Sequence, residues 1–152
     1  MPALSDRSPA DVLLVEDDPG DVLLVREAFD QHTSGSLLYV VTDGEQALQF
    51  LRREGQFGGV PRPGLILLDL NLPRRNGLDV LAEIRADGDL EAIPVVMLTT
   101  SRAPQDVLRS YQLHTSAYVT KPTDYDDFIA AVGQIDDFYL RLVQLPNAPA
   151  DQ

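Results

Sequence analysis

The chain contains no cysteine, and among its 152 residues it has only 12 Lys and Arg against 24 Asp and Glu. The absence of cysteine excludes disulfides, thiol catalysis and zinc sites with Cys ligands. The formal net charge of −12 argues against binding nucleic acid or an anionic membrane through bulk electrostatics. No apolar run approaches the roughly 18 residues that span a bilayer, and Met1 to Asp11 lack the apolar stretch of a signal peptide. We therefore expect a cytoplasmic protein with no direct nucleic-acid contact and no membrane insertion.

The composition is typical of a single globular domain. Hydrophobic residues make up 44% of the chain and charged residues 24%, which is neither the pattern of a disordered tail nor that of a fibre. We predict one domain over residues 11–145, with a flexible N-terminus over 1–10 and a flexible tail over 146–152.

Five short apolar runs recur along the chain, and an amphipathic segment follows each of them. This alternation predicts repeated βα units. Near-continuous Val, Leu and Ile runs are typical of parallel strands buried on both faces, which need helices on both sides of the sheet. The predicted fold class is therefore α/β, a three-layer αβα sandwich. The predicted strands are Val12 to Val15, Leu37 to Val41, Leu65 to Leu68, Val95 to Leu98 and Ala117 to Thr120.

Helix-start signals follow these runs. Asp, Asn or Thr side chains can accept hydrogen bonds from the free N–H groups of a first turn, and proline fits the first helical position. For Asp18 we favour such a capping role over a role in metal binding. The predicted helix starts are Asp18-Pro19, Thr42-Asp43, Asn76-Gly77, Ala103-Pro104 and Thr123-Asp124.

The last helix is predicted to be unusually long. A helix from about Tyr125 to Leu145 would span roughly 31 Å, whereas a strand of about six residues spans ~20 Å. Its apolar side chains exceed what one sheet edge can cover, and such a patch marks a partner surface. We therefore expect a twofold homodimer. The predicted dimer surface contains Phe138, Tyr139, Leu142, Val143 and Leu145.

Polar residues stand where the predicted strands end. In an open parallel sheet, ligands bind outside the carboxyl ends of the strands. Clustered carboxylates repel one another unless a cation compensates, and Mg²⁺ suits oxygen ligands while leaving positions for a phosphoryl group. An aspartate there can attack phosphorus and form an acyl phosphate, with a lysine pairing the phosphoryl oxygens. The residues concerned are Glu16-Asp17-Asp18, Asp69-Leu70-Asn71, Thr99-Thr100-Ser101 and Lys121-Pro122.

These blocks resemble the receiver domains of two-component response regulators of the chemotaxis-protein type. The resemblance runs from about Asp11 to Leu145. Its motifs are Glu16-Asp17, Asp69 within LLDLNLPRRNG, Thr99 in VVMLTT, and Lys121-Pro122. It implies the flavodoxin-like (βα)5 fold with strand order 2-1-3-4-5, and a signalling phosphoacceptor that is no enzyme beyond Mg-dependent self-phosphorylation and self-dephosphorylation.

The resemblance also implies a role for each motif residue. Asp69 is the expected phosphoacceptor, and Lys121 pairs with the phosphoryl group. Thr99 and Tyr118 match the hydroxyl and the aromatic ring of the family's switch, with Thr100 as the alternative should the alignment slip by one. The family often has a cis peptide bond before the following proline, here Pro122. The expected ligands of Mg²⁺, or of Mn²⁺, are Glu16, Asp17, Asp69 and the backbone carbonyl of Asn71.

A narrower resemblance is to the regulators that pair with bacterial phytochromes. Those proteins have a long loop before the third strand and an extended last helix; the matching stretches here are Gln56 to Gly64 and Asp136 to Pro146. The resemblance implies a stand-alone regulator that receives its phosphoryl group from a sensor histidine kinase, with a bacteriophytochrome as the expected partner. Phosphorylation would switch the surface of the fourth helix, fifth strand and fifth helix.

Three other functions fit parts of the pattern. A metal-dependent phosphatase with an aspartyl nucleophile commonly has a second Asp where Asn71 stands. A flavin or nucleotide carrier would need a phosphate-binding loop without the carboxylates of Glu16-Asp17-Asp18. A phosphorylation-independent dimeric adaptor would need the last helix but not Asp69. Labelling by a kinase, turnover of phosphate esters and the colour of the purified protein would discriminate among them.

Overall fold

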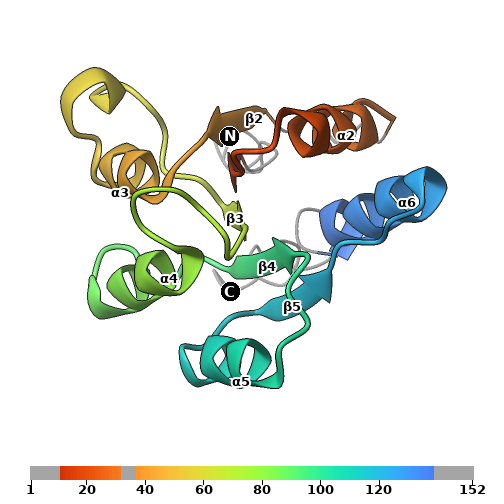
Figure 1. Ribbon diagram of the computed structural model, residues 1–152. Coiled ribbons are helices and arrows are strands. Elements are labelled where there is room, and N and C mark those ends of the chain that lie inside the picture. The colour runs from red at the N-terminus through yellow and green to blue at the C-terminus, as the bar shows by residue number, and fades with distance from the viewer. Residues whose placement is uncertain (1–10, 32–36, 139–152) are drawn as a thin grey trace, which may run out of the picture.

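The computed structural model of the chain, which describes residues 11–31 and 37–138, is built around a five-stranded parallel sheet (Figure 1). The strand order is β2-β1-β3-β4-β5, as the family resemblance implied. Strands and helices alternate along the chain, which confirms the predicted βα units. The strands are β1 (Val12–Val15), β2 (Leu38–Val41), β3 (Leu65–Leu68), β4 (Val95–Thr99) and β5 (Ala117–Thr120). The helices are α2 (Pro19–Gln31), α3 (Gly44–Arg52), η1 (Gly55–Phe57), α4 (Gly77–Ala86), α5 (Pro104–Gln112) and α6 (Tyr125–Asp136).

The apolar runs become strands because the helices cover both faces of the sheet. Every residue of β1, β3 and β4 is buried, whereas the edge strands β2 and β5 are largely half-buried. Two predicted strand bounds shift by one residue: Leu37 precedes β2 and is 59% exposed, and Thr99 is the last residue of β4. The predicted three-layer α/β class is confirmed.

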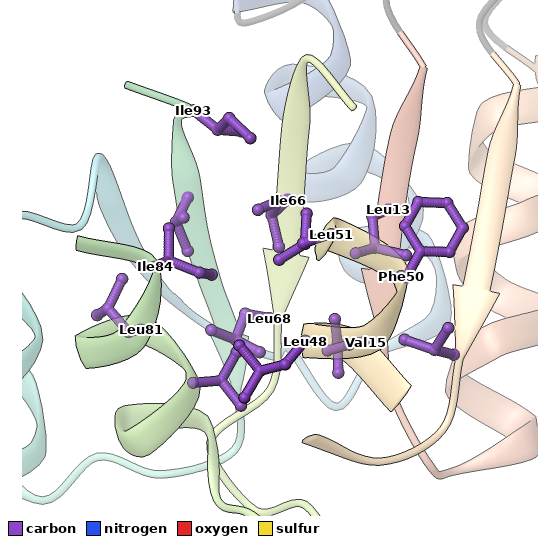
Figure 2. Packing of buried hydrophobic residues seen from close by; sticks show 14 of the residues in the cluster. Leu13, Val15, Leu48, Phe50, Leu51, Ile66, Leu68, Leu81, Ile84 and Ile93 are labelled. Atoms are coloured by element: carbon purple, nitrogen blue, oxygen red, sulfur yellow. The ribbon is translucent and has the colours of Figure 1, made fainter. Parts of the chain in front are cut away.

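Two hydrophobic clusters join the layers. α2 and α6 pack on one face of the sheet, and α3 and α4 pack on the other (Figure 1). Figure 2 shows Leu51 and Leu48 of α3 close to Ile66 and Leu68 of β3, and Ile84 of α4 belongs to the same cluster. The ring of Phe50 also packs against Phe57 of η1, with 5.4 Å between the ring centroids. This contact anchors the Gly- and Pro-rich connection before β3.

The helix starts agree with the capping signals. Asp43, Asn76 and Asp124 each accept a hydrogen bond from the backbone N–H three residues later, at 2.7, 2.9 and 3.1 Å. Asp18 Oδ1 accepts from the N–H of Gly20 at 2.8 Å, so its predicted capping role is confirmed. These caps stabilise helix starts that all lie at the edge of the sheet where the strands end.

The predicted extension of the last helix lies partly outside the described residues. α6 is described from Tyr125 to Asp136, and Phe138 beyond it is 52% exposed. The rest of the predicted dimer surface, which is Tyr139, Leu142, Val143 and Leu145, falls outside that part of the chain, as do the predicted flexible ends 1–10 and 146–152. Among the described helices, none is both long enough and apolar enough to span a membrane.

Candidate functional site

The strand-end residues meet at one edge of the sheet. Glu16 and Asp17 follow β1, Asp69 follows β3, and Lys121 follows β5. The register aligns these ends, because Val15 pairs with both Val41 and Leu68.

Backbone hydrogen bonds continue the sheet just past the strand ends. The N–H of Asp69 donates to the carbonyl of Val15 at 3.1 Å, and the N–H of Lys121 donates to the carbonyl of Thr99 at 2.8 Å. The N–H of Glu16 donates to the carbonyl of Val41 at 3.0 Å. The backbone of each functional residue is therefore held by the neighbouring strand.

A close backbone approach places α4 against the phosphoacceptor candidate. A Cβ atom on Gly77 would lie 2.2 Å from the carbonyl oxygen of Asp69. The N–H of Gly77 donates to the carbonyl of Leu70 at 2.7 Å, which holds the start of α4 in place. A side chain at position 77 would force the loop after β3 outward. Asn76 is therefore needed for the helix cap, and Gly77 is needed for this close contact.

Lys121 lies at the centre of an acidic group and is almost fully buried. Its Nζ lies 2.5 Å from Glu16 Oε1 and 3.4 Å from Asp69 Oδ2. The side chains of Lys121, Glu16 and Asp69 are 5%, 3% and 8% exposed. Buried charges at such distances interact far more strongly than charges in water, because the surroundings screen them less.

Carboxylates outnumber the ammonium group, and burial and neighbouring charges shift the pKa values of both Glu16 and Lys121. Burial, together with the charge of Asp69, raises the pKa of Glu16 to about 7, although the hydrogen bond from Lys121 opposes the shift. Burial alone would lower the pKa of Lys121, but hydrogen bonds to Asp21 and Glu16 raise it above its ordinary value of 10.5. The site therefore holds a permanent cation and more negative charge than that cation neutralises.

The acidic group has the chemistry of a divalent metal site. One ligand oxygen from each of Glu16, Asp17 and Asp69 lies within 4.8 Å of the others. Oxygens bound to Mg²⁺ at about 2.1 Å lie roughly 3–4 Å apart, so small side-chain movements would close the shell. Asp17 is exposed while the other two are buried, which leaves one side of the group open to solvent. Hard oxygen donors and excess negative charge both suit Mg²⁺ or Mn²⁺.

Comparison with known proteins identifies this arrangement. Residues 12–133 match the response regulator receiver domain family. The chain belongs to this family. It is 46% identical over 147 residues to response regulator Rcp1 of Synechocystis sp. (strain ATCC 27184 / PCC 6803 / Kazusa), an alignment that covers 95% of this chain and 100% of Rcp1.

Two solved receiver structures are similar to the fold described above. The crystal structure of the phosphorylated cyanobacterial phytochrome response regulator RcpA has a TM-score of 0.86 at 41% identity, covering 88% of this chain and 96% of the RcpA chain. The Mn²⁺-bound form of Rcp1 has a TM-score of 0.84 at 45% identity, with the same coverage of 88% and 96%. Both resemblances inferred from sequence, to receiver domains and to phytochrome regulators, are thereby confirmed.

The predicted switch residues of this receiver domain are linked through Ser101. Thr99 is fully buried, and its Oγ1 accepts a hydrogen bond from the N–H of Ser101 at 3.4 Å. Tyr118 Oη donates to the carbonyl of Ser101 at 2.9 Å, and burial raises the pKa of Tyr118. Thr100, the alternative to Thr99, is exposed. The geometry brings Thr99 and Tyr118 to the same loop, and their switching role stays a prediction.

Two further expectations meet the structure differently. The N–H of Asn71 donates to Asp69 Oδ1 at 3.3 Å, so the loop that carries the predicted carbonyl ligand is held at the acidic group. The peptide bond before Pro122 is trans, because residues 11–31 and 37–138 contain no cis peptide bond. The cis bond that the family pattern suggested is therefore not present.

Sequence reasoning missed one residue of the site. Asp21, in the first turn of α2, places its Oδ2 2.8 Å from Lys121 Nζ, closer than Asp69 does. It stands four residues after Asp17, one helical turn along the chain. That spacing is a signal, but it is also the ordinary position of an acid at a helix start, which is how such residues are usually interpreted.

Proposed function

We propose that this receiver domain accepts a phosphoryl group on Asp69 from a sensor histidine kinase, with Mg²⁺ as cofactor. The observation that carries the proposal is the position of Asp69. Its carboxylate lies 3.4 Å from the ammonium of Lys121 and belongs to the same group of potential metal ligands as Glu16 and Asp17. The carboxylate of Asp69 thus has the ammonium of Lys121 on one side and potential metal ligands nearby, and phosphoryl transfer requires both kinds of positive charge.

The transfer step follows from these positions. A carboxylate oxygen of Asp69 forms a bond to phosphorus while the bond between phosphorus and the kinase histidine breaks, and the imidazole leaves with the electron pair. Lys121 pairs with the transferred phosphoryl oxygens. Glu16, Asp17, Asp69 and the carbonyl of Asn71 would hold Mg²⁺, which supplies positive charge against the developing negative charge.

Switching would start at Thr99. Thr99 ends β4, and its backbone carbonyl accepts a hydrogen bond from the N–H of Lys121 at 2.8 Å. Its hydroxyl would donate a hydrogen bond to the phosphoryl group. A shift of Thr99 would act on Ser101, whose N–H and carbonyl contact Thr99 and Tyr118. The surface formed by α5, β5 and α6 would then change its population of two states. A complete change from 1:99 to 99:1 needs about 5.5 kcal/mol, so we expect a partial shift.

The partners belong to the same proposal. Rcp1 and RcpA are among the proteins similar to this chain, and RcpA is a cyanobacterial phytochrome response regulator. We therefore expect a bacteriophytochrome as the kinase, acting in the cytoplasm. The exposed ring of Phe138 supports a homodimer through α6 and the residues that follow it.

Phosphorylation of Asp69 can be tested directly. Wild-type protein should take up label from a phosphorylated kinase or from acetyl phosphate, and Asp69→Asn should take up none. Asp79→Asn removes an exposed acid from the first turn of α4 and is the control for loss of charge. Equal labelling of wild type and Asp69→Asn would overturn the assignment. Continuous turnover of small phosphate esters would support a phosphatase instead.

A further inference from the structure

The ammonium of Lys121 has a carboxylate partner that belongs to neither the phosphoacceptor nor the predicted metal ligands. Asp21 Oδ2 lies 2.8 Å from Nζ, whereas Asp69 Oδ2 lies 3.4 Å from it. Over the described residues, the potential metal ligands form one group of Glu16, Asp17 and Asp69, and Asp21 is not a member. The contact with Lys121 is therefore what brings Asp21 into the site.

The two contacts pull the ammonium in different directions. Asp21 is on α2, which packs beside α6, while Asp69 follows the central strand β3. An ammonium group has three N–H donors, and here three carboxylates surround it, with Asp69 as the most distant. Charge-assisted N–H···O bonds are strongest at about 2.7–2.9 Å, so the contact with Asp69 is the weakest of the three. A phosphoryl group on Asp69 would therefore compete with Asp21 and Glu16 for the N–H donors of Lys121.

We propose that Asp21 restrains Lys121, holding its ammonium toward α2 and thereby weakening the binding of a phosphoryl group at Asp69. This inference rests on the proposed function. Asp21 acts through Lys121 and is a positioning residue: it sets how readily the site accepts phosphorus. The contact also ties the first turn of α2 to the site, so movement of Lys121 toward a phosphoryl group loosens the hold on α2.

The geometry offers a mild substitution. Asp21→Asn keeps the size of the side chain and one acceptor oxygen but removes the charge, so the hydrogen bond to Lys121 weakens without creating a void. The Asp18 cap, which accepts hydrogen bonds from the N–H groups of Gly20 and Asp21, is untouched. Asp21 is 22% exposed, so its substitution is expected to leave the fold intact.

The probe is beryllofluoride, which mimics a phosphoryl group on an aspartate, titrated calorimetrically in saturating Mg²⁺. Asp21→Asn should bind it about three- to fivefold more tightly than wild type, the upper part of the range expected for losing one partly exposed ion pair. Asp21→Glu restores the charge and should return the affinity toward that of wild type. Asp79→Asn, an acid lost from the first turn of another helix, should stay within about twofold of wild type.

The salt dependence of binding distinguishes two explanations of tighter binding by Asp21→Asn. Asp21 either holds Lys121 by direct contact or repels the anionic probe through space. Through-space repulsion is screened, because the Debye length falls from about 10 Å at 0.1 M to about 3 Å at 1 M salt. The tighter binding of Asp21→Asn should persist at 1 M NaCl if Asp21 acts by contact, and its loss there would overturn the restraint. Unchanged or weaker binding by Asp21→Asn, with wild type binding normally, would also overturn it. Failure of wild type to bind beryllofluoride would instead overturn the proposed function and the inference with it.

Discussion

Lys121 and Arg85 are each surrounded by acceptors, near opposite ends of the strands, and their surroundings differ in kind. Lys121 follows β5 and contacts carboxylates. Arg85 is on α4, and its acceptors are four backbone carbonyls in the segments that precede β4 and β5. They belong to Glu91, Ile93, Leu113 and His114, at 2.7–3.2 Å.

The difference fits a structural role for Arg85 and the phosphoryl-binding role proposed for Lys121. The carbonyl partners of Arg85 are neutral dipoles held by the backbone, so the guanidinium joins three segments and needs no further charge. Lys121 is surrounded by more negative charge than it neutralises, which calls for an additional cation; burial, with the charge of Asp69 added to it, raises the pKa of Glu16. Charged surroundings are expensive to build, and sites that contain them tend to be functional.

The largest expected effect comes from removing the positive charge of Lys121. Lys121→Met should slow phosphorylation by acetyl phosphate about 100-fold or more, because the charge that stabilises the transferred oxygens is lost. Rapid-quench labelling would measure the rate. Arg85→Lys, compared at equal folded concentration, should react at the wild-type rate. A similar loss of rate in both variants would remove the distinction between the two cations.

Binding of Mg²⁺ at the acidic group around Lys121 should stabilise the folded protein. At a free Mg²⁺ concentration 100 times its Kd, the free energy of unfolding should rise by about 2.7 kcal/mol. Urea titrations with Mg²⁺ and with EDTA would show the shift, and Asp17→Asn should abolish most of it. An Mg²⁺ effect of the same size in Asp17→Asn would place the ion elsewhere.

Removing the guanidinium of Arg85 should destabilise the folded state. Arg85→Ala leaves four carbonyls without their charged donor and should lower the free energy of unfolding by about 2–3 kcal/mol in chemical denaturation. The control is Arg52→Ala, whose side chain is 36% exposed and pairs with Glu83 at 2.9 Å. Its loss should cost about 0–1 kcal/mol. An equal loss of unfolding free energy in Arg85→Ala and Arg52→Ala would contradict the proposal that Arg85 joins three segments of the fold.

The smallest effect concerns pH in metal-free buffer. With its pKa raised to about 7, Glu16 keeps a proton in the folded state that the unfolded chain has lost above about pH 4.5. The stability of wild type relative to Glu16→Gln should therefore fall by about 1–2 kcal/mol as pH rises from 4.5 to 7, the folded state binding more protons over that window. Parallel stability profiles for the two proteins, measured by urea unfolding, would show that Glu16 is ionised throughout.

Much of the fold was accessible from residue patterns. The bounds of β1 and β3 were predicted without error, because strands buried on both faces have uninterrupted apolar residues. The first residue of β2, an edge strand, was misplaced because Leu37 is apolar yet 59% exposed, and apolar residues at an edge need not be covered. α6 agrees with prediction over Tyr125–Asp136.

The sequence predicted most residues of the site but not all of them. Glu16, Asp69 and Lys121 were expected to meet because parallel strands bring their carboxyl ends to one edge, although Lys121 stands 105 residues from Glu16. Asp21 was missed although it stands 100 residues from Lys121, a similar separation. It lies on a helix, and no rule of strand topology states where a helical side chain points.

The amino-acid sequence by itself determined which chemical groups follow each strand, and hence that acids, a hydroxyl and an ammonium share one edge. Only the tertiary structure decided how the ammonium divides its contacts among Glu16, Asp21 and Asp69, and that Glu16 has a raised pKa. The physical reason is that the hydrophobic pattern indicates where each strand ends, whereas contact distances and burial depend on how α2 packs against the sheet. Electrostatic energies change steeply with both.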